Sequence, residues 1–254
     1  MTSLDLNIFQ PLVARQPYPL AFITAGSAHQ YGFADPGERA ELRGVHVLPP
    51  QEVMGLYPKR ETIETHGDAG GIELDLVTHD VQKFMNLMLR PNGYVLEQLT
   101  SPLVVHTSQA HDALKALVPG CVTRNHVHHY LGFARNGWEL LDKHTPWRVK
   151  PLLYVYRVLL TGIHLMKTGR IEANLPRLNE SFKLAYIPGL IARKTGGAEH
   201  GALDDAERAF HQREYERLLA QLEREGERSK LSDVPSCAQE MNTLLLRLRG
   251  MRTG

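Results

Sequence analysis

A change in the spacing of apolar residues near residue 111 divides this chain into two parts. Before it, short apolar or alternating segments predict strands at residues 19–24, 41–48 and 71–77. After it, apolar residues recur every three or four positions and predict helices at residues 112–117, 124–143, 150–168, 179–195, 204–230 and 238–248. We therefore expect an α+β fold. A small mixed sheet with flanking helices would occupy residues 1–110, and a helical domain packed against it would occupy residues 111–254.

The third predicted strand places two carboxylates on one of its faces. Within residues 71–77, apolar side chains alternate with Glu73, Asp75 and Val77, so these three share a face of the strand. A helix is expected to follow, with Thr78 as its N-cap, and to stop before the Pro-Asn-Gly sequence at residues 91–93.

Charge and cysteine content exclude several classes of protein. The 29 Lys and Arg residues nearly balance 28 Asp and Glu residues, which excludes a basic nucleic-acid coat and an acidic tail, so a charged partner must meet a local patch. Two cysteines, Cys121 and Cys237, are too few for a disulfide framework or a four-thiolate zinc site. A reducing cytoplasm is therefore the expected location.

No segment has the pattern of a signal peptide or a membrane span. The first 16 residues contain Asp5 and lack a continuous apolar run, and Arg157 and His164 interrupt the most apolar segment, residues 151–166. We expect a protein without a membrane partner.

A Gly-Ser pair and nearby carboxylates surround the start of the second predicted strand. Gly26 and Ser27 follow the first strand, and Glu38 and Glu41 precede Arg43. A Gly-Ser turn lets backbone N–H groups and a hydroxyl approach a phosphate, and carboxylates on the next strand can hold a divalent metal that bridges the phosphates. The pattern favours nucleotidyl transfer.

The tract GSAHQYGFADPGERAELRGVHVLP, residues 26–49, resembles nucleotidyltransferases of the DNA polymerase beta superfamily. Their motif is Gly-Ser, a spacer and Asp-x-Asp, with a third carboxylate on a later strand. The tract is also similar to a bacterial branch of predicted nucleotidyltransferases associated with RNA repair, in which Tyr-Gly follows the Gly-Ser turn and Arg-Gly-Val follows the second acidic residue. The resemblance implies a palm domain of the polymerase-beta type at residues 1–110.

Two later segments carry the same resemblance. Residues 74–105 look like a family segment with an acidic residue, a Lys-Phe pair on a helix, an Asn and a Glu, here Asp75, Lys83, Phe84, Asn92 and Glu97. Residues 150–176 are similar to the family's nucleotide-side helix, whose polar residues are here Lys150, Tyr154 and Arg157. Together the matches cover most of residues 22–176.

One departure from the family pattern alters the metal site. Register counted from the Tyr-Gly and Arg-Gly pairs places Arg39 where the family has the first aspartate, and Glu41 where it has the second. Two bound metals need carboxylates that bridge them, and a guanidinium cannot coordinate a metal.

Three interpretations of this departure stay open. In the first, Glu38 replaces the missing ligand, so that Glu38, Glu41 and Asp75 hold one or two Mg²⁺ or Mn²⁺ ions. In the second, Glu41 and Asp75 hold one metal while Arg39 neutralises phosphate charge directly. In the third, the protein binds a nucleotide or nucleic acid without catalysing a reaction.

The resemblance also implies roles for individual residues. An acceptor hydroxyl would attack the α-phosphate of a nucleoside triphosphate (NTP) in line, and pyrophosphate would leave. Gly26 and Ser27 would hold the β- and γ-phosphates, Glu41 and Asp75 would hold metal, and Asp75 is also a candidate to accept the acceptor's proton. The other residues expected at the nucleotide are His29, Arg39, Arg43, Lys83, Lys150 and Arg157.

Several of these residues have structural alternatives. Ser27 can simply cap a turn, and Glu73 is the alternative third carboxylate, with Asp75 favoured by its spacing from Lys83. Arg157 lies in an apolar helix and needs a partner, which can be a structural carboxylate or a ligand phosphate.

The leading prediction is a metal-dependent nucleotidyltransferase whose acceptor is an RNA end, a protein hydroxyl or a small molecule. The alternative is a catalytically degraded family member that acts as a nucleotide- or RNA-binding module. RNA or a cognate protein is the expected macromolecular partner, and an NTP is the expected substrate.

Overall fold

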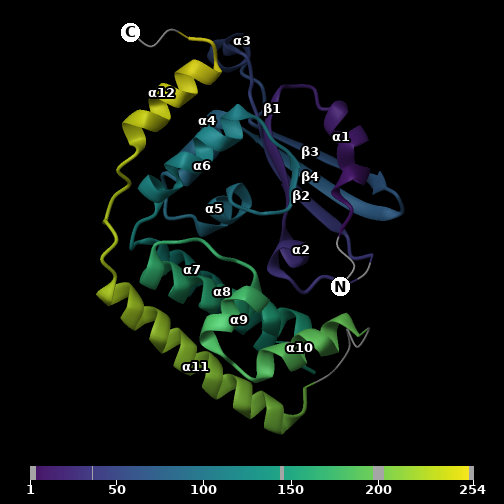
Figure 1. The fold of residues 1–254 in the computed structure, drawn as a ribbon, viewed down its shortest axis with the longest axis vertical. Coiled ribbons are helices and arrows are strands. Elements are labelled where there is room, and N and C mark those ends of the chain that lie inside the picture. Colours follow the sequence, from purple (N-terminus) through teal and green to yellow (C-terminus); the bar gives the residue numbers. More distant parts are fainter. Residues whose placement is uncertain (1–3, 36, 144–145, 197–202, 252–254) are drawn as a thin grey trace. The chain divides into compact units, whose positions relative to one another are not determined.

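A mixed sheet of five strands organises the first part of the structure (Figure 1). This computed structural model describes residues 4–35, 37–143, 146–196 and 203–251. The strands run in the order β3-β4-β2-β1-β5 and are β1 (Leu20–Ala25), β2 (Ala40–His46), β3 (Thr62–Ala69), β4 (Ile72–Asp80) and β5 (Val104–His106). Strands β2 and β4 are parallel, and the other neighbours are antiparallel. The predicted α+β fold, with flanking helices and a C-terminal helical region, is confirmed.

The three predicted strands correspond to β1, β2 and β4, whereas β3 and β5 were not expected. A two-residue turn, Gly70 and Gly71, joins β3 to β4, and both residues have positive φ, +62° and +80°. Hairpin turns with positive φ at both central positions match the twist of the strands and strongly prefer glycine. The Gly-Gly pair is therefore the sequence signal that predicts β3.

Helix α4 (Val81–Met88) begins later than expected, and the prediction of Thr78 as its N-cap is wrong. Strand β4 continues to Asp80, and the buried Thr78 hydroxyl lies 2.9 Å from Nδ1 of His46. Asp80 is the cap, because its carboxylate accepts the N–H of Gln82 at 3.0 Å. The alternation of β4 carries Thr78 into the interior, where it cannot cap the helix.

Opposite faces of the sheet meet different helices. On one face, Ile23, Leu42 and Leu76 form an apolar cluster with Phe9 of the 3-10 helix η1 (Leu6–Phe9), which runs into α1 (Gln10–Ala14). On the other face, Phe22 stacks on a histidine of α6 (Gln109–Cys121), and Thr24 donates to a backbone carbonyl of α5 (Gly93–Leu99) at 2.9 Å. Both faces of β1 are therefore buried, as its continuous apolar sequence predicts.

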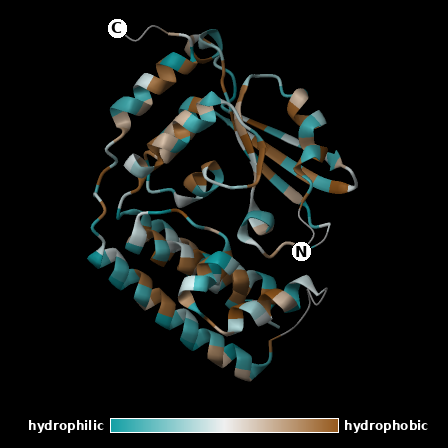
Figure 2. Cartoon of the chain, in the orientation of Figure 1, coloured by the Kyte–Doolittle hydropathy of each residue, from teal (hydrophilic) through white to brown (hydrophobic). Residues whose placement is uncertain are grey.

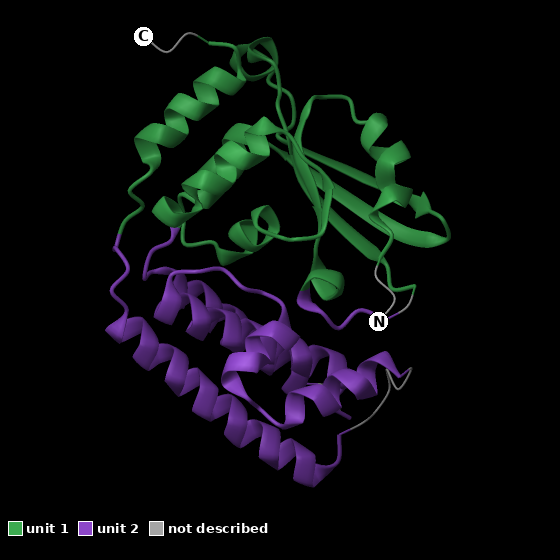
Figure 3. Ribbon diagram, in the orientation of Figure 1, with its two compact units in different colours: residues 1–30, 37–121, 234–254 green, residues 31–36, 122–233 purple. Residues whose placement is uncertain are grey.

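The chain divides into two compact units (Figure 3). Unit 1 comprises residues 1–30, 37–121 and 234–254, and unit 2 comprises residues 31–36 and 122–233. Unit 1 holds the sheet, and its further helices include α3 (Pro50–Met54) and α12 (Ala238–Leu248); α2 (Ser27–Tyr31) ends at the first division. Unit 2 is helical, with α7 (His126–Asp142), α8 (Val149–Thr168), α9 (Leu175–Phe182), α10 (Tyr186–Thr195) and α11 (Asp205–Arg228). The division between residues 110 and 111 stays a prediction about functional domains.

Helix α8 is the buried centre of unit 2. Fourteen of its 20 residues are buried, whereas α11 is largely hydrophilic (Figure 2) and buries one stripe that includes Tyr215, Leu218 and Leu222. A capping box begins α11: Asp204 accepts the N–H of Glu207 at 2.8 Å, and Glu207 accepts the N–H of Asp204 at 3.0 Å.

One helix predicted at residues 179–195 is wrong, because the structure has two helices there. Lys183 has a positive φ of +53° and ends α9, and α10 begins at Tyr186. The side chain of Asn179 holds the turn by accepting the N–H of Leu184 at 2.9 Å and donating to its carbonyl at 3.2 Å. The apolar periodicity of the sequence did not predict the turn between α9 and α10, because no glycine occurs there.

The C-terminal segment of the described chain returns to unit 1. Cys237 precedes α12, and its Sγ lies 3.2 Å from Sγ of Cys121 at the end of α6. Arg249, after α12, is buried and donates to the carboxylate of Asp80 at 2.7 Å. In the described part of the chain, none of the helices combines the length and the apolar character that crossing a bilayer requires.

We expect the protein to lose stability as the pH falls from 6.5 toward 4. Burial is the largest cause that lowers the pKa of seven histidines below 6.5: His46, His79, His111, His126, His129, His164 and His211. The pKa values of His79 and His129 fall to about 4. The unfolded chain then binds more protons than the folded chain in this range, so stability is complete above pH 6.5 and is lost below it.

Urea unfolding at a series of pH values checks this expectation. The decisive window is pH 6.5 to 5, because most carboxylates titrate below it. A free energy of unfolding that stays constant across this window would contradict the neutral, buried state of these histidines.

Candidate functional site

Glu41 and Asp75 lie directly opposite each other on the neighbouring parallel strands β2 and β4. The residues that follow them, Leu42 and Leu76, point into the apolar cluster on the other face. The two carboxylates therefore project from the same face of the sheet, on strands that are about 4.8 Å apart. The sequence expectation that these two acidic residues come together agrees with this register.

The Gly-Ser turn is tied to the same part of β2. The N–H of Gly26 donates to the carbonyl of Glu41 at 2.8 Å, so this amide fixes the turn beside the carboxylate strand and is not directed at a ligand. Ser27 begins α2 with a φ of +54°. A non-glycine residue at positive φ stores strain and is a feature that often marks a functional site.

Close contact between β1 and β2 explains the glycine of the Arg-Gly-Val sequence. A Cβ built on Gly44 would lie 2.5 Å from the carbonyl oxygen of Phe22, which is shorter than any ordinary contact. Glycine at this position therefore lets the strand that carries Glu41 pack tightly beside the strand that leads into the Gly-Ser turn.

Three basic side chains contact the two carboxylates. Arg39 forms an ion pair with Asp75, and Nδ1 of His66 on β3 lies 2.5 Å from the other oxygen of Asp75. Nη2 of Arg43 donates to Glu41 at 3.0 Å. Each carboxylate thus has at least one basic partner within the chain, so negative and basic side chains lie next to each other at the site.

The donor set is compatible with one divalent ion but does not form a two-metal platform. Among the residues that the structure describes, no group of three or more His, Cys, Asp or Glu side chains could hold a metal. Mg²⁺ is commonly held by one or two protein carboxylates together with substrate phosphates. Glu41 and Asp75 fit that smaller requirement, provided that Arg39 moves from Asp75 to a phosphate.

Helix α2 and the loop that follows it carry two further predicted residues. Nε2 of His29 lies 3.1 Å from the backbone carbonyl of Glu38, so the histidine contacts the start of the segment that leads to Arg39. The structure therefore places His29 of α2 against the loop that carries Glu38 and Arg39 and leads into β2.

Lys83 is not brought to the two carboxylates. Its ammonium donates to the hydroxyl of Thr62 at 2.6 Å, and Thr62 pairs with His79. His79 lies four residues beyond Asp75 on β4, or about 13 Å along the strand. Burial, with a smaller effect of Lys83, lowers the pKa of His79 to about 4.

Lys150 and Arg157 belong to α8 in unit 2. Arg157 is buried, and its guanidinium lies 3.9 Å from the centroid of the Tyr31 ring. Tyr154 contacts the same ring edge to face. Stacking on an aromatic ring is a partner for Arg157 that the sequence interpretation, which named a carboxylate or a phosphate, had missed.

Glu73 and Asp75 occupy different surroundings although they share a face of β4. Glu73 is exposed and lies opposite Asp68 near the hairpin turn, whereas Asp75 lies between Glu41 and His66. His66 was missed by sequence reasoning because β3 was not predicted. The Gly-Gly turn and alternation before it were the signals available.

Comparison with known protein families decides the family. The family model RlaP, described as the RNA repair pathway DNA polymerase beta family, matches residues 1–247. The chain belongs to the RlaP family. Membership relates this chain to the DNA polymerase beta family of RNA repair pathways.

Individual relatives are less informative about this chain than the family model. The RlaP chain is 26% identical over 155 residues to uncharacterized protein MJ0002 of Methanocaldococcus jannaschii, covering 60% of this chain and 63% of that protein. It therefore spans less than two thirds of that relative's length. A solved nucleotidyltransferase-like protein from Exiguobacterium sibiricum is 12% identical with a TM-score of 0.33, and the match covers 97% of this chain and 79% of that chain.

Proposed function

We propose that this RlaP protein transfers a nucleoside monophosphate from an NTP to a hydroxyl acceptor, with release of pyrophosphate. The observation that carries the proposal is the register of β2 and β4, which sets Glu41 opposite Asp75 beside the Gly26–Ser27 turn. Phosphoryl transfer depends chiefly on positioning and charge neutralisation. The strained turn and the adjoining strands supply the positioning, and the acidic pair supplies ligands for a divalent ion that would neutralise phosphate charge.

The proposed roles follow from these positions. Ser27 contacts the β- and γ-phosphates, and Gly26 keeps the turn close to β2. Arg39 and Arg43 exchange their carboxylate partners for phosphate oxygens, because a guanidinium binds either anion through parallel N–H donors. Asp75 accepts the proton of the attacking hydroxyl.

Mg²⁺ or Mn²⁺ is the proposed cofactor. Glu41 and Asp75 would hold it, and when bound it would neutralise negative charge on the phosphates. Glu38, in the loop before β2, is the additional ligand if a third carboxylate is recruited. Asp75 is preferred to Glu73 because it faces Glu41, while Glu73 faces Asp68.

The remaining predicted residues differ in how far their positions support a role at the nucleotide. His29, next to the Gly-Ser turn, is proposed to contact the triphosphate. Lys83, which donates to Thr62, and Lys150 and Arg157, which belong to unit 2, keep nucleotide-binding roles only as expectations of the family resemblance. The proposed acceptor is an RNA end, with a protein hydroxyl or a small molecule as the alternatives, and the proposed location is the cytoplasm.

A second candidate function rests on the Arg39–Asp75 ion pair. In this candidate, Arg39 occupies the place of a metal ligand permanently, and the protein binds a nucleotide or RNA without turnover. The two candidates differ in their dependence on metal. A binding module that uses Arg39 needs no divalent ion, whereas transfer through Glu41 and Asp75 does.

Incubation with each α-labelled NTP, an RNA pool and Mg²⁺ or Mn²⁺ tests the proposal. Label is expected in the RNA, with pyrophosphate released in equal amount and no reaction in EDTA. Calorimetry of NTP binding with and without Mg²⁺ runs in parallel. Metal-independent binding without label transfer to RNA, to the protein itself or to a small molecule would establish the binding module instead.

A further inference from the structure

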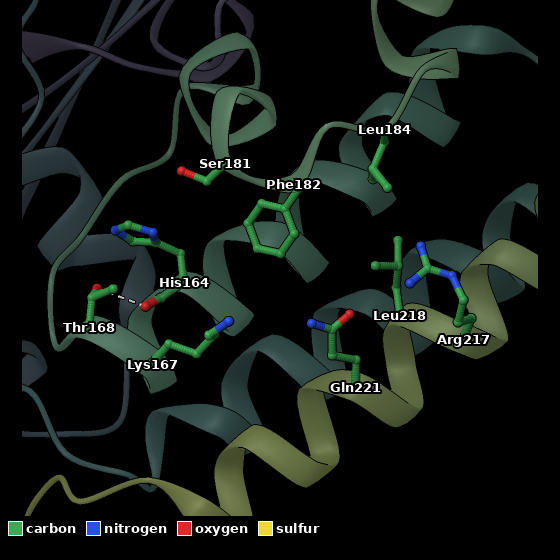
Figure 4. A pocket seen from close by; sticks show the side chains of 9 residues that line it. All are labelled: His164, Lys167, Thr168, Ser181, Phe182, Leu184, Arg217, Leu218 and Gln221. Atoms are coloured by element: carbon green, nitrogen blue, oxygen red, sulfur yellow. Dashed lines mark hydrogen bonds between the residues drawn. The ribbon is translucent and has the colours of Figure 1, made fainter.

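A cavity in unit 2 has no role in the proposed transfer. Its volume is about 430 Å³, and its walls come from α8, from the end of α9 with the turn that follows it, and from α11 (Figure 4). It is lined by His164, Lys167, Thr168, Ser181, Phe182, Leu184, Arg217, Leu218 and Gln221. This volume lies within the range of small-molecule sites. None of the lining residues belongs to the set proposed for nucleotidyl transfer.

The lining is basic. It contains the side chains of Lys167 and Arg217 and not a single carboxylate. Within the described residues, Lys167 forms neither an ion pair nor a side-chain hydrogen bond, so its ammonium charge is not compensated by a neighbour. An unpaired cation that lines a concave site favours an anionic ligand.

Arg217 is a positioned cation rather than a mobile one. Its Nε and Nη2 donate to the two carboxylate oxygens of Glu214 at 3.0 and 2.8 Å, and the Tyr186 hydroxyl donates to the same carboxylate at 2.9 Å. The guanidinium is thereby fixed at one wall of the cavity. His164 adds a neutral polar group to the lining. Burial lowers the pKa of His164, so its ring is uncharged near pH 7.

The apolar wall is carried by a strained turn. Phe182, Leu184 and Leu218 line the cavity, and Figure 4 shows the Phe182 ring between His164 and Leu184. Lys183, between Phe182 and Leu184, has the positive φ of +53°, and Asn179 clamps the turn through both hydrogen bonds to Leu184. A turn held in this way presents the ring in a fixed position.

We propose that this cavity binds a nucleotide, with its base on Phe182 and its phosphate at Lys167. An aromatic ring is a stacking surface for any base, and an ammonium is a common phosphate ligand. Gln221 and Ser181 then supply hydrogen bonds to base or ribose. The same chemistry occurs in a free nucleotide and in one nucleotide of a single-stranded RNA. This proposal does not depend on transfer at Glu41 and Asp75.

Titration of the full chain with two probes tests the proposal. The probes are AMP and a 5′-phosphorylated oligoadenylate of eight nucleotides, both in EDTA and at low salt, with binding measured by calorimetry. Lys167→Ala and Phe182→Ala are each expected to weaken binding of at least one probe by about tenfold, the size of one lost stacking or phosphate contact. The charge-matched control is Arg170→Ala, since Arg170 is exposed and outside the lining.

The pattern of losses identifies the source of the ligand. Weaker binding of AMP by both cavity variants indicates a free nucleotide, and weaker binding of the oligonucleotide alone indicates RNA. Phe182→Leu, which keeps the wall apolar and removes the stacking surface, replaces Phe182→Ala if that variant does not fold. Equal affinities for wild type, Lys167→Ala and Phe182→Leu, or the absence of binding by wild type, would overturn the proposal, whatever the result of the transfer assay.

Discussion

The substitution Asp75→Asn is expected to lower kcat/KM for nucleotidyl transfer by roughly 100- to 1,000-fold, the size of effect seen when one preorganised charge-stabilising group is removed. Asparagine keeps the shape of the side chain and loses its charge and its ability to accept a proton. It also leaves Arg39 and His66 without their shared carboxylate partner. The measurement is the initial rate of label transfer from an α-labelled NTP at fixed Mg²⁺.

Glu73→Gln is the matched control for this substitution. Glu73 stands two residues earlier on the same face of β4 but is exposed and lies opposite Asp68. The same chemical change there should leave kcat/KM within a factor of about two, as expected for a surface position. If Glu73→Gln were the inactive variant and Asp75→Asn the active one, the third carboxylate would be Glu73.

The second large effect concerns stability. Arg249→Met is expected to lower the free energy of unfolding by about 3–5 kcal/mol, because it leaves the carboxylate of Asp80 buried without its cation. The two side chains are 4% and 1% exposed, and the guanidinium also donates to Gln82 at 3.3 Å and to the carbonyl of Leu48. Urea unfolding at pH 7 measures the loss.

Arg247→Met provides the control for Arg249→Met. Arg247 lies in α12 itself and is exposed, so the same substitution there should change stability by about 0.5 kcal/mol or less. A double variant, Arg249→Met with Asp80→Asn, should recover part of the loss, since it removes the unpaired charge. Equal stability of Arg249→Met and wild type would show that the buried pair is not needed to hold the C-terminal segment.

Local patterns predicted the elements that build the site, and the reason is visible in particular residues. β4 alternates apolar and polar residues, β1 is a short apolar run that ends at a Gly-Ser pair, and both patterns are typical of strands. Helix α12 was predicted at its observed bounds, Ala238–Leu248. The capping box at Asp204 marked the start of α11. Apolar patterns and helix caps depend on residues close together in the chain, so a single sequence is enough to detect them.

The partners of the site carboxylates were not predictable in the same way. The sequence places Arg39 in the motif, but its ion pair with Asp75 depends on the parallel register of β2 and β4 across 36 residues of chain. His66 required β3, whose polar sequence gives weak alternation. Cys121 and Cys237, 116 residues apart, lie together only because the C-terminal segment returns to α6. Tertiary pairing over such separations leaves no local pattern.

The return of the C-terminal segment also sets an order of events during synthesis. Asp80 and Arg249 are 169 residues apart, and the whole of α7 to α11 is translated between them. At about 5–20 residues per second, the nascent sheet waits roughly 10–30 seconds before the cation that neutralises Asp80 exists. During that interval all the helices of unit 2 are synthesised, whereas unit 1 stays incomplete until Arg249 has been added.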